Sequence, residues 1–297
     1  MPKPFRFAIV TAGAGSRSAW LDLARKAEDQ GYSTLLMVDR IMTPFAPLTA
    51  LAMAAGATTK LRIGSYVFCN DFRHPALLAR EVATLDLLSE GRFELGIGAG
   101  VGPANYTELG LPFEEAGTRV SRLEEALHII KQFFTQEVVN FSGKYYTITE
   151  MKGMPRPAQK PHPPIILGCG GKRMLSIGAR EADIIVVTPL RGAQGPDPAD
   201  MTPEQKGDFL RERAGEQRFE QIELAQTAYP IMITDSTIDV SVQSRALPPF
   251  LPKMQMSTEQ AIEHLLEQRD RLGYSYIQVS DSQADAFAPI VARLAGK

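Results

Sequence analysis

The 297-residue sequence lacks the features that are typical of disulfide-rich, metal-binding, membrane-spanning, secreted and nucleic-acid-binding proteins. Its two cysteines, Cys69 and Cys169, are too few for a disulfide framework and lack the spacing of a metal site. No apolar run approaches the roughly 18 residues of a membrane span, and the first residues lack the apolar core of a signal peptide. A net charge of -2 without a basic stripe argues against a nucleic-acid partner. We therefore expect a cytoplasmic protein that binds no metal, does not associate with a membrane and has no nucleic-acid partner.

Short apolar runs alternate with amphipathic helical segments along the whole chain. Runs that are rich in branched or aromatic side chains and bounded by turn residues are typical of strands covered on both faces. We predict eight strands, at residues 5–10, 34–38, 61–67, 93–98, 164–167, 183–187, 228–233 and 274–279. The best-marked helices between and after them are 19–30, 76–88, 118–134, 257–272 and 285–294. This alternation predicts an α/β fold, a (β/α)8 TIM barrel that forms a single domain over residues 1–297.

Two long gaps between the predicted strands indicate insertions after the fourth and the sixth strand. In the first insertion, residues 138–141 and 144–147 flank Ser142-Gly143 and predict a β-hairpin. The second, residues 189–203, is rich in glycine and proline, and it is either a mobile lid or a disordered surface segment. Barrels of this type carry their chemistry in the loops that follow the strands, so we expect the site residues in those loops.

The loop after the predicted fifth strand has the residues of an anion site. Gly170 and Gly171 follow residues 164–167, and a helix begins directly beside them. The backbone N–H groups of glycines and a helix N-terminus attract phosphate, and Lys172 and Arg173 add positive charge. We therefore expect phosphate binding there; the alternative is a short flexible loop with basic surface residues.

Asp39 ends the second predicted strand, where its carboxylate either accepts hydrogen bonds from a bound ring, transfers a proton or only caps the strand. Glycine clusters at 13–15 and 96–102 match a dinucleotide-binding loop poorly, since Ser18 replaces the third glycine of the first and the second runs into Pro103. The sequence has no Ser/His/Asp set, no metal-ligand cluster and no P-loop lysine. A barrel with a phosphate site and little acid–base machinery indicates a cofactor that brings its own reactivity.

Several motifs together resemble those of a known family. They are Asp39, Gly64-Ser65-Tyr66-Val67, Phe72-Arg73-His74-Pro75, 83–92, Arg122-Leu123-Glu124-Glu125, Pro155-Arg156-Pro157, Gly170-Gly171, 178–183 and 286–289. On these residues the sequence resembles the luciferase-like monooxygenase superfamily, and within it the branch of coenzyme F420-dependent oxidoreductases. The resemblance covers nearly the whole chain.

The resemblance implies a deazaflavin or flavin ring in the barrel mouth, next to a non-proline cis peptide bond at Tyr66-Val67. The catalytic residues that it implies are Asp39, Arg40 and Tyr66. The cofactor-binding residues that it implies are Asp39, Tyr66, Val67, Cys69, Asn70, Ala99, Gly100, Asn105, Gly170, Gly171, Lys172 and Thr188. Among these, Gly170 and Gly171 would bind the phosphate.

One departure from the family pattern narrows the expected activity. Sugar-phosphate dehydrogenases of this branch carry a histidine and a glutamate where this sequence has Arg40 and Val101. We therefore expect hydride transfer between reduced F420 and a small organic substrate with an unsaturated or carbonyl group, with the proton coming from solvent, Tyr66 or Tyr106. The alternatives are an FMN-dependent, two-component monooxygenase and a non-catalytic flavin-binding barrel. We also consider a homodimer, because members of this family commonly form dimers.

Overall fold

A computed structural model describes residues 2–192, 195–244 and 253–297. The main sheet consists of the strand segments β1 (Arg6–Thr11), β2 (Thr34–Met37), β3 (Arg62–Ser65), β4 (Phe68–Cys69), β5 (Phe93–Gly98), β8 (Ile165–Cys169), β9 (Ile184–Val187), β12 (Glu223–Thr227) and β15 (Tyr274–Ser280). Their order is β3-β2-β1-β15-β12-β9-β8-β5-β4, and β3 also pairs with β5. Because β3 and β4 both pair with β5 as parts of one interrupted strand, the sheet is a closed barrel of eight parallel strands. The predicted (β/α)8 TIM barrel is confirmed.

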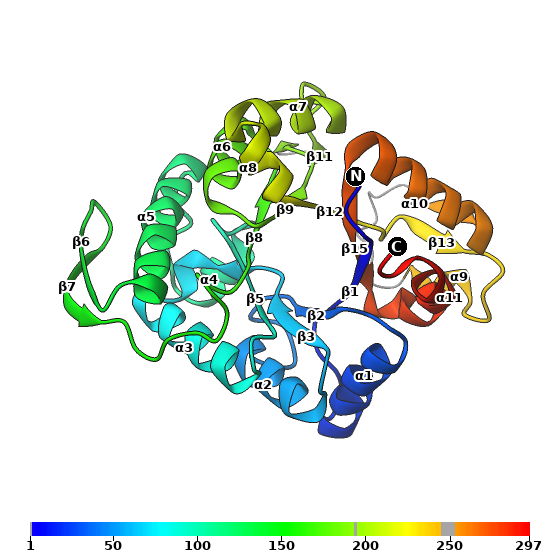
Figure 1. Cartoon of the computed structure of the whole chain (residues 1–297), viewed down its shortest axis with the longest axis horizontal. Helices are drawn as coiled ribbons and strands as arrows, with labels where there is room; N and C mark the ends of the chain where they lie inside the picture. Colours follow the sequence, from blue (N-terminus) through cyan, green and yellow to red (C-terminus); the bar gives the residue numbers. More distant parts are fainter. Residues whose placement is uncertain (1, 193–194, 245–252) are drawn as a thin grey trace. The chain divides into compact units, whose positions relative to one another are not determined.

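Most helices and the smaller strand pairs lie between the barrel strands along the chain, and the 3-10 turn η2 and helix α11 follow the last one (Figure 1). The helices are α1 (Arg17–Asp29), α2 (Pro47–Ala57), α3 (Pro75–Leu88), α4 (Ala104–Glu108), α5 (Ala116–Thr135), α6 (Lys172–Glu181), α7 (Pro203–Ala214), α8 (Glu216–Gln221), α9 (Val240–Gln243), α10 (Thr258–Leu272) and α11 (Ala284–Leu294), with short 3-10 turns η1 (Asn70–Phe72) and η2 (Asp281–Gln283). The small pairs are β6 (Val138–Ser142) with β7 (Thr147–Lys152), β10 (Arg191–Gly192) with β11 (Gly195–Pro196), and β13 (Ile231–Ile233) with β14 (Met254–Met256).

The chain divides into two compact units. The first unit comprises Met1–Thr11, Asp22–Leu36 and Gly168–Lys297, and the second comprises Ala12–Leu21 and Met37–Leu167. Among the described residues of both units, no helix is long and apolar enough to cross a membrane.

In the second unit, helix α3 packs against α5 and against strand β5 (Figure 1). Its first residue is Pro75, whose missing N–H costs nothing in the first turn of a helix. Leu78 and Val82, spaced one turn apart, are fully buried toward the sheet. Both α3 and β5 fall where the periodicity of the sequence predicted a helix and a strand.

Asp86 and Arg92, which belong to the longest of the family-like motifs, tie the end of α3 to its surroundings. The buried carboxylate of Asp86 accepts hydrogen bonds from the backbone and the side chain of Gln159, at 2.9 and 2.6 Å. The guanidinium of Arg92 donates to the carbonyl oxygens of Leu61 and Ala55, at 2.8 and 2.9 Å. Asp86 and Arg92 therefore stabilise the fold, and the candidate site residues lie in other loops.

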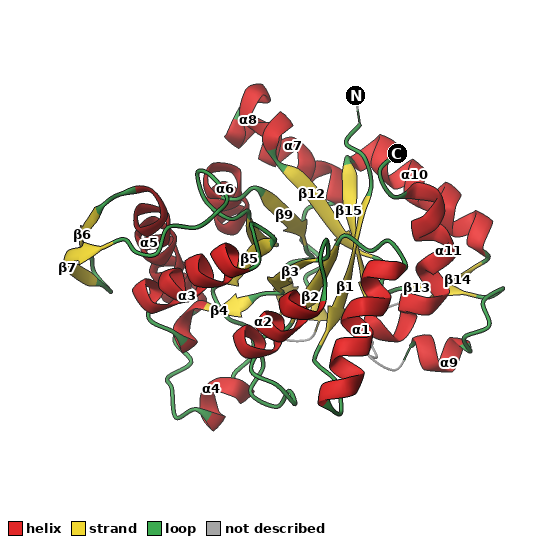
Figure 2. Cartoon of the chain, turned by 60° about the horizontal axis from the view of Figure 1, so that its bottom comes forward, coloured by secondary structure: helices red, strands yellow, loops and turns green. Residues whose placement is uncertain are grey.

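In the first unit, β15 pairs in parallel with β1 and with β12, and β12 pairs with β9 (Figure 2). The prediction that residues 228–233 form the seventh barrel strand is wrong. That strand is β12, which ends at Thr227, and a turn at Tyr229-Pro230 follows it. A proline has no N–H for a strand ladder, so the apolar run beyond it pairs with β14 outside the barrel.

Both predicted insertions are present, and a further one was missed. After β5, strands β6 and β7 form an antiparallel hairpin as predicted, but its second strand is Thr147–Lys152 and not residues 144–147. After β9, the described part of residues 189–203 contains the β10–β11 pair, and the carboxylate of Asp200 accepts a hydrogen bond from the backbone N–H of Leu190 at 2.7 Å. The missed insertion follows β12 and contains β13, α9 and β14.

Candidate functional site

The side chain of Asp39 lies just beyond β2 in the second unit and is only 4% exposed. Its two oxygens accept a bidentate pair of hydrogen bonds from the Arg73 guanidinium, at 2.6 and 2.9 Å. The backbone N–H of Cys69 donates a third hydrogen bond to the same carboxylate at 3.0 Å. A carboxylate offers about four acceptor positions, so about one stays available, on the oxygen that accepts a single hydrogen bond.

Tyr66 and Val67 interrupt the third barrel strand between β3 and β4. The peptide bond between them is cis, which confirms the expectation from the resemblance. The N–H of Tyr66 donates to the carbonyl oxygen of Met37 at 2.7 Å, which joins this point to the end of β2. Burial raises the pKa of the Tyr66 phenol above its ordinary value, so the phenol keeps its proton at neutral pH.

Cys69, Gly100 and Tyr106 meet in one compact cluster. The Cys69 Sγ lies 3.3 Å from the Tyr106 hydroxyl, and that hydroxyl donates a hydrogen bond to Asp71 at 2.9 Å. Gly100 has φ +79°, and a Cβ there would lie 2.0 Å from the Tyr106 hydroxyl oxygen and 2.8 Å from Cys69 Sγ. Only glycine fits at this position. Burial raises the pKa of the Cys69 thiol.

The loop after β5 is held by Arg119, whose side chain sequence reasoning missed. Arg119 is 8% exposed and donates to the carbonyl oxygens of Ala99 and Gly100, at 2.9 and 2.5 Å. Asn105, also expected to bind the cofactor, accepts a hydrogen bond on Oδ1 from the backbone N–H of Ile41 at 3.1 Å. Asn105 therefore fastens the loop that follows Arg40, and Arg40 itself is exposed.

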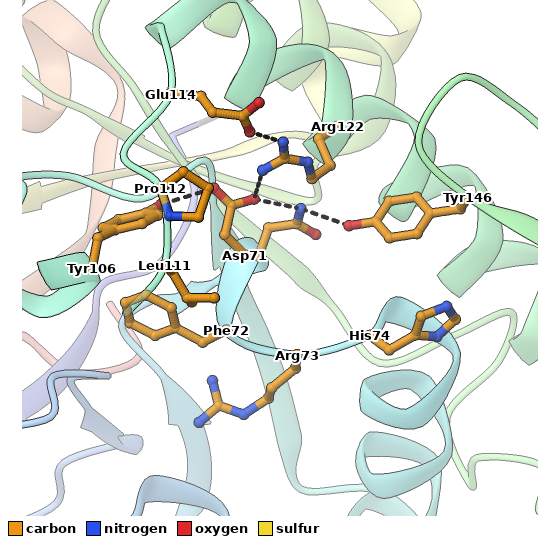
Figure 3. A pocket seen from close by; sticks show the side chains of 11 residues that line it. Asp71, Phe72, Arg73, His74, Tyr106, Leu111, Pro112, Glu114, Arg122 and Tyr146 are labelled. Atoms are coloured by element: carbon orange, nitrogen blue, oxygen red, sulfur yellow. Dashed lines mark hydrogen bonds and ion pairs between the residues drawn. The ribbon is translucent and has the colours of Figure 1, made fainter. Parts of the chain in front are cut away.

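A cavity of 410 Å³ lies beside this cluster, within the second unit. It is lined by Asn70, Asp71, Phe72, Arg73, His74, Tyr106, Leu111, Pro112, Glu114, Arg122 and Tyr146. Figure 3 shows Arg122 between Asp71 and Glu114, with the Tyr106 hydroxyl on the other side of Asp71. Of the expected cofactor residues, Asn70 lines this cavity.

The remaining expected residues lie in the first unit, around the start of α6. Gly171 is the residue before the helix, and no side chain caps the helix there. Gly170 lies beside the end of β9, because a Cβ on it would be 3.2 Å from Thr188 Oγ1. Lys172, the first residue of α6, is exposed.

The structure thus groups the expected residues into two clusters. In the second unit it joins Asp39 to Cys69 and Cys69 to Gly100, and in the first unit it joins Gly170 to Thr188. Sequence reasoning missed Asp71, Arg119 and Tyr146 as site-forming groups, and it named Tyr106 only as a possible proton donor. Arg73 and Arg122 stood in family-like motifs, but their ion pairs with Asp39 and Asp71 were not predicted.

Comparison with known proteins gives a consistent result. The family model of luciferase-like monooxygenases matches residues 4–236. An F420-dependent glucose-6-phosphate dehydrogenase of Kineococcus radiotolerans is 34% identical over 179 residues, which cover 58% of this chain and 52% of that protein. The match therefore spans about half the length of that relative.

Solved structures resemble the whole chain at low sequence identity. The F420-dependent tetrahydromethanopterin reductase of Methanopyrus kandleri has a TM-score of 0.76 and 17% identity, with 96% of this chain and 97% of that chain covered. The monooxygenase RslO1 of Streptomyces bottropensis has a TM-score of 0.78 and 18% identity, with 97% and 98% covered. At these identities the likeness shows the fold.

Proposed function

Because the chain belongs to the luciferase-like monooxygenase family, we propose that it is an F420-dependent oxidoreductase that transfers a hydride between the deazaflavin and a small organic substrate. The relative from Kineococcus is named for F420 dependence, and so is the reductase from Methanopyrus with the same fold. The observation that supports the proposal most is the buried Asp39 carboxylate, which keeps about one acceptor position for an N–H group of a bound ring.

The residues of each unit fit such a cofactor. F420 supplies a ring carbon that carries a hydride, and the protein supplies orientation. In the second unit, Asp39, Cys69 and Asn70 would contact the ring. Because Gly100 has no side chain, the β5 loop lies close to Cys69 and Tyr106, and the backbone of this loop would contact the cofactor.

In the first unit, the start of α6 would hold a phosphate. The helix begins after Gly171 without a side-chain cap, so an anion can take the place of the cap. Thr188 offers a hydroxyl beside Gly170, and the exposed Lys172 adds a positive charge. A phosphate here would be bound mainly by main-chain groups.

The reduction of a substrate also needs a proton, and Tyr66 is the best donor. A hydride adds two electrons to an electrophilic carbon of the substrate, and the neighbouring atom then takes a proton. Tyr106 already donates its proton to Asp71. Tyr66 is half-buried and protonated at neutral pH, and because burial raises its pKa it would be a weak proton donor.

The substrate that we propose is an unsaturated or carbonyl compound and not a sugar phosphate. At the two positions where sugar-phosphate dehydrogenases of the family place histidine and glutamate, this chain has Arg40 and Val101. Arg40 is exposed and Val101 is 78% exposed, so neither replaces an acid–base pair in a buried site.

Binding and turnover measurements test the proposal. The purified protein is titrated with F420, reduced F420 and FMN by fluorescence, and oxidation of the reduced cofactors in air is followed by stopped flow. We expect micromolar binding of F420 and slow reaction of its reduced form with oxygen. Binding of FMN with none of F420, or binding of F420 without turnover of any compound in a broad carbonyl and alkene panel, would overturn it.

The proton donor is tested by Tyr66→Phe, with Tyr145→Phe as the matched control. We expect Tyr66→Phe to keep the F420 affinity and to lower the rate of substrate reduction at least tenfold. Tyr145→Phe also removes one phenol, outside the proposed site, and should change neither value. Equal rates in both variants would leave solvent as the proton source.

A further inference from the structure

Lys206, on helix α7 of the first unit, is only 2% exposed, and lysine is almost never fully buried unless its charge is paired. We propose that Lys206 is a positioning residue for the phosphate of the cofactor: it holds residues 188–190 against Gly170 and Gly171, where the phosphate would bind. The inference rests on the proposed function and deepens it, because it names the residue that makes the site select deazaflavins with a phosphate.

The first argument is the pair of hydrogen bonds that the buried ammonium group makes. Lys206 Nζ donates to Asp200 Oδ2 at 2.5 Å and to the carbonyl oxygen of Thr188 at 2.7 Å. Both acceptors belong to the segment between β9 and α7. Burying a charge is costly unless the charge is paired and hydrogen-bonded, and an apolar residue would cover the same face of α7 without that cost. The lysine is therefore explained by the groups that it holds and not by packing alone.

The second argument is that Asp200 extends this hold to Leu190. The backbone N–H of Leu190 donates to the same carboxylate oxygen at 2.7 Å. Lys206 thus contacts Thr188 directly and Leu190 through Asp200. Pro189, between them, has a φ angle that its ring fixes. The three successive residues are therefore held at both ends by one buried ion pair.

The third argument is that these three residues lie against the two glycines. A Cβ on Gly170 would be 3.1 Å from the carbonyl oxygen of Pro189 and 3.2 Å from Thr188 Oγ1. A Cβ on Gly171 would be 3.3 Å from Leu190 Cδ1. Helix α7 also packs against α6, whose first turn follows these glycines (Figure 1). A shift of residues 188–190 would therefore change the space at the start of α6.

The role that follows for Lys206 is one of position and not of charge. Its ammonium group is neutralised by the Asp200 carboxylate at 2.5 Å, so the pair adds little attraction for an anion. The attraction at this site would come from the start of α6 and from the exposed Lys172. Loss of either member of the pair should then affect a ligand through its phosphate and spare a ligand that has none.

Two deazaflavins test the proposal: F420 and 8-hydroxy-5-deazariboflavin, which has the same ring and ribityl chain but no phosphate. Their dissociation constants are measured by fluorescence titration. In the wild-type protein we expect F420 to bind at least tenfold more tightly than the deazariboflavin. Lys206→Met keeps the apolar stem and removes the ammonium group, so it should weaken F420 binding about tenfold and leave the deazariboflavin affinity within about twofold. Similar weakening of both ligands, or an unchanged F420 affinity, would overturn the proposal.

A second variant keeps the test decisive if Lys206→Met fails to fold. Asp200→Ala removes the acceptor that Lys206 and Leu190 share, so it should also weaken F420 binding several-fold and spare the deazariboflavin. Tighter F420 binding in Asp200→Ala would mean that the unpaired ammonium group attracts the phosphate directly, which would overturn a positioning role.

The matched control is another lysine–aspartate pair in the first unit. Lys26 pairs with Asp285 at 2.6 Å, and the side chain of Lys26 is 54% exposed. Lys26→Met should leave both affinities unchanged. A loss of F420 affinity as large as that of Lys206→Met would contradict a specific role of Lys206.

A measurement without any cofactor tests the hold itself. Hydrogen exchange of the Leu190 amide should be several-fold faster in Lys206→Met than in the wild-type protein, because Asp200 loses the cation that keeps it in place. The amide of Ala179, within α6, should exchange at the same rate in both proteins. An unchanged rate at Leu190 would refute the proposed hold.

The proposed function and the role of Lys206 fail in different ways. A wild-type protein that binds neither deazaflavin would lose the proposed function and this inference with it. A wild-type protein that binds both deazaflavins with equal affinity would leave the proposed hydride transfer standing. It would overturn this inference, because there would be no phosphate site for Lys206 to shape.

Discussion

The cluster around Asp39 and the start of helix α6 are both proposed to bind parts of one cofactor, yet they are built from different groups. Around Asp39, side chains make the structure, because a buried carboxylate holds a guanidinium and a backbone N–H. At the start of α6, two glycines and an uncapped helix end leave the main chain accessible. Removing a side chain should therefore damage the first region, whereas the second should be damaged only by adding one.

The largest effect is expected from Asp39→Ala. The variant leaves the Arg73 guanidinium, 23% exposed, without its partner and removes the acceptor of the Cys69 N–H. We expect a loss of about 2–3 kcal/mol in the free energy of unfolding, at or below the lower end for broken buried pairs because Arg73 is partly exposed. F420 binding should weaken more than a hundredfold. Denaturant unfolding and fluorescence titration measure the two effects.

A matched control uses an ion pair on the surface. Asp22 pairs with Arg25 at 3.6 Å, and its side chain is 73% exposed. Asp22→Ala should change the free energy of unfolding by no more than about 0.5 kcal/mol. The double variant Asp39→Ala/Arg73→Ala should lose less than the sum of the single variants, and strict additivity would show that the two side chains do not act as a pair.

A smaller effect is expected from Arg119→Met, which keeps the length of the side chain but removes its N–H groups. Arg119 holds the carbonyl oxygens of Ala99 and Gly100, so the β5 loop should loosen. We expect a loss of about 2 kcal/mol in stability, since hydrogen bonds of charged groups contribute about 1.5–3 kcal/mol, and several-fold weaker F420 binding. Arg25→Met, at an exposed position, is the control; equal losses in both would remove Arg119 from the site.

Much of the fold could be predicted because its signals are local. Strand β5 has the predicted bounds, and helix α10 begins after Ser257, where reciprocal Ser257–Gln260 hydrogen bonds cap it, within one residue of the predicted start. The seventh strand was misplaced because Glu223–Thr227 is short and partly polar, whereas the apolar run after Pro230 looked more like a strand. Pairing with the neighbouring strands β9 and β15 places residues 223–227 in the barrel, and a single sequence does not show which strands pair.

The site was less predictable, because its contacts join residues far apart in the chain. The resemblance indicated Asp39, Cys69 and the cis bond at Tyr66-Val67, which the structure contains. Neither periodicity nor spacing indicates that Arg73 would face Asp39 or that Arg119 would hold the β5 loop. Such pairs form only once the helices have packed, so they require the tertiary structure.

At the start of helix α6, we expect a substitution to weaken F420 binding tenfold and to leave the stability of the protein almost unchanged. In Gly171→Val, the new Cβ would lie 3.3 Å from Leu190 Cδ1, the flexible end of a half-exposed side chain, so the fold should tolerate it. The branched side chain would cover the N–H groups at the start of α6, and we expect F420 to bind at least tenfold more weakly, about 1.4 kcal/mol. The melting temperature should stay the same. Gly207→Val, at a helical glycine with open space around it, is the control. An unchanged affinity would mean that Gly171 serves only the turn.

The smallest effect concerns Cys169, the thiol at the end of β8 beneath the start of α6. Burial raises the pKa of Cys169 to about 12, whereas an unfolded thiol titrates near 9.0. Above pH 9.0 the thiol loses its proton in the unfolded chain but keeps it in the folded one. The free energy of unfolding therefore keeps the whole contribution of this thiol below pH 9 and loses it progressively as the pH rises toward 12. Cys169→Ser keeps a donor for the carbonyl oxygen of Met174 but does not titrate. Between pH 9 and pH 10, the wild-type protein should lose about 1 kcal/mol more of its free energy of unfolding than the variant. If the free energy of unfolding fell equally with pH in the wild-type protein and in Cys169→Ser, the thiol would be open to water. The start of α6 would then not differ in burial from its surroundings as the cluster around Asp39 does.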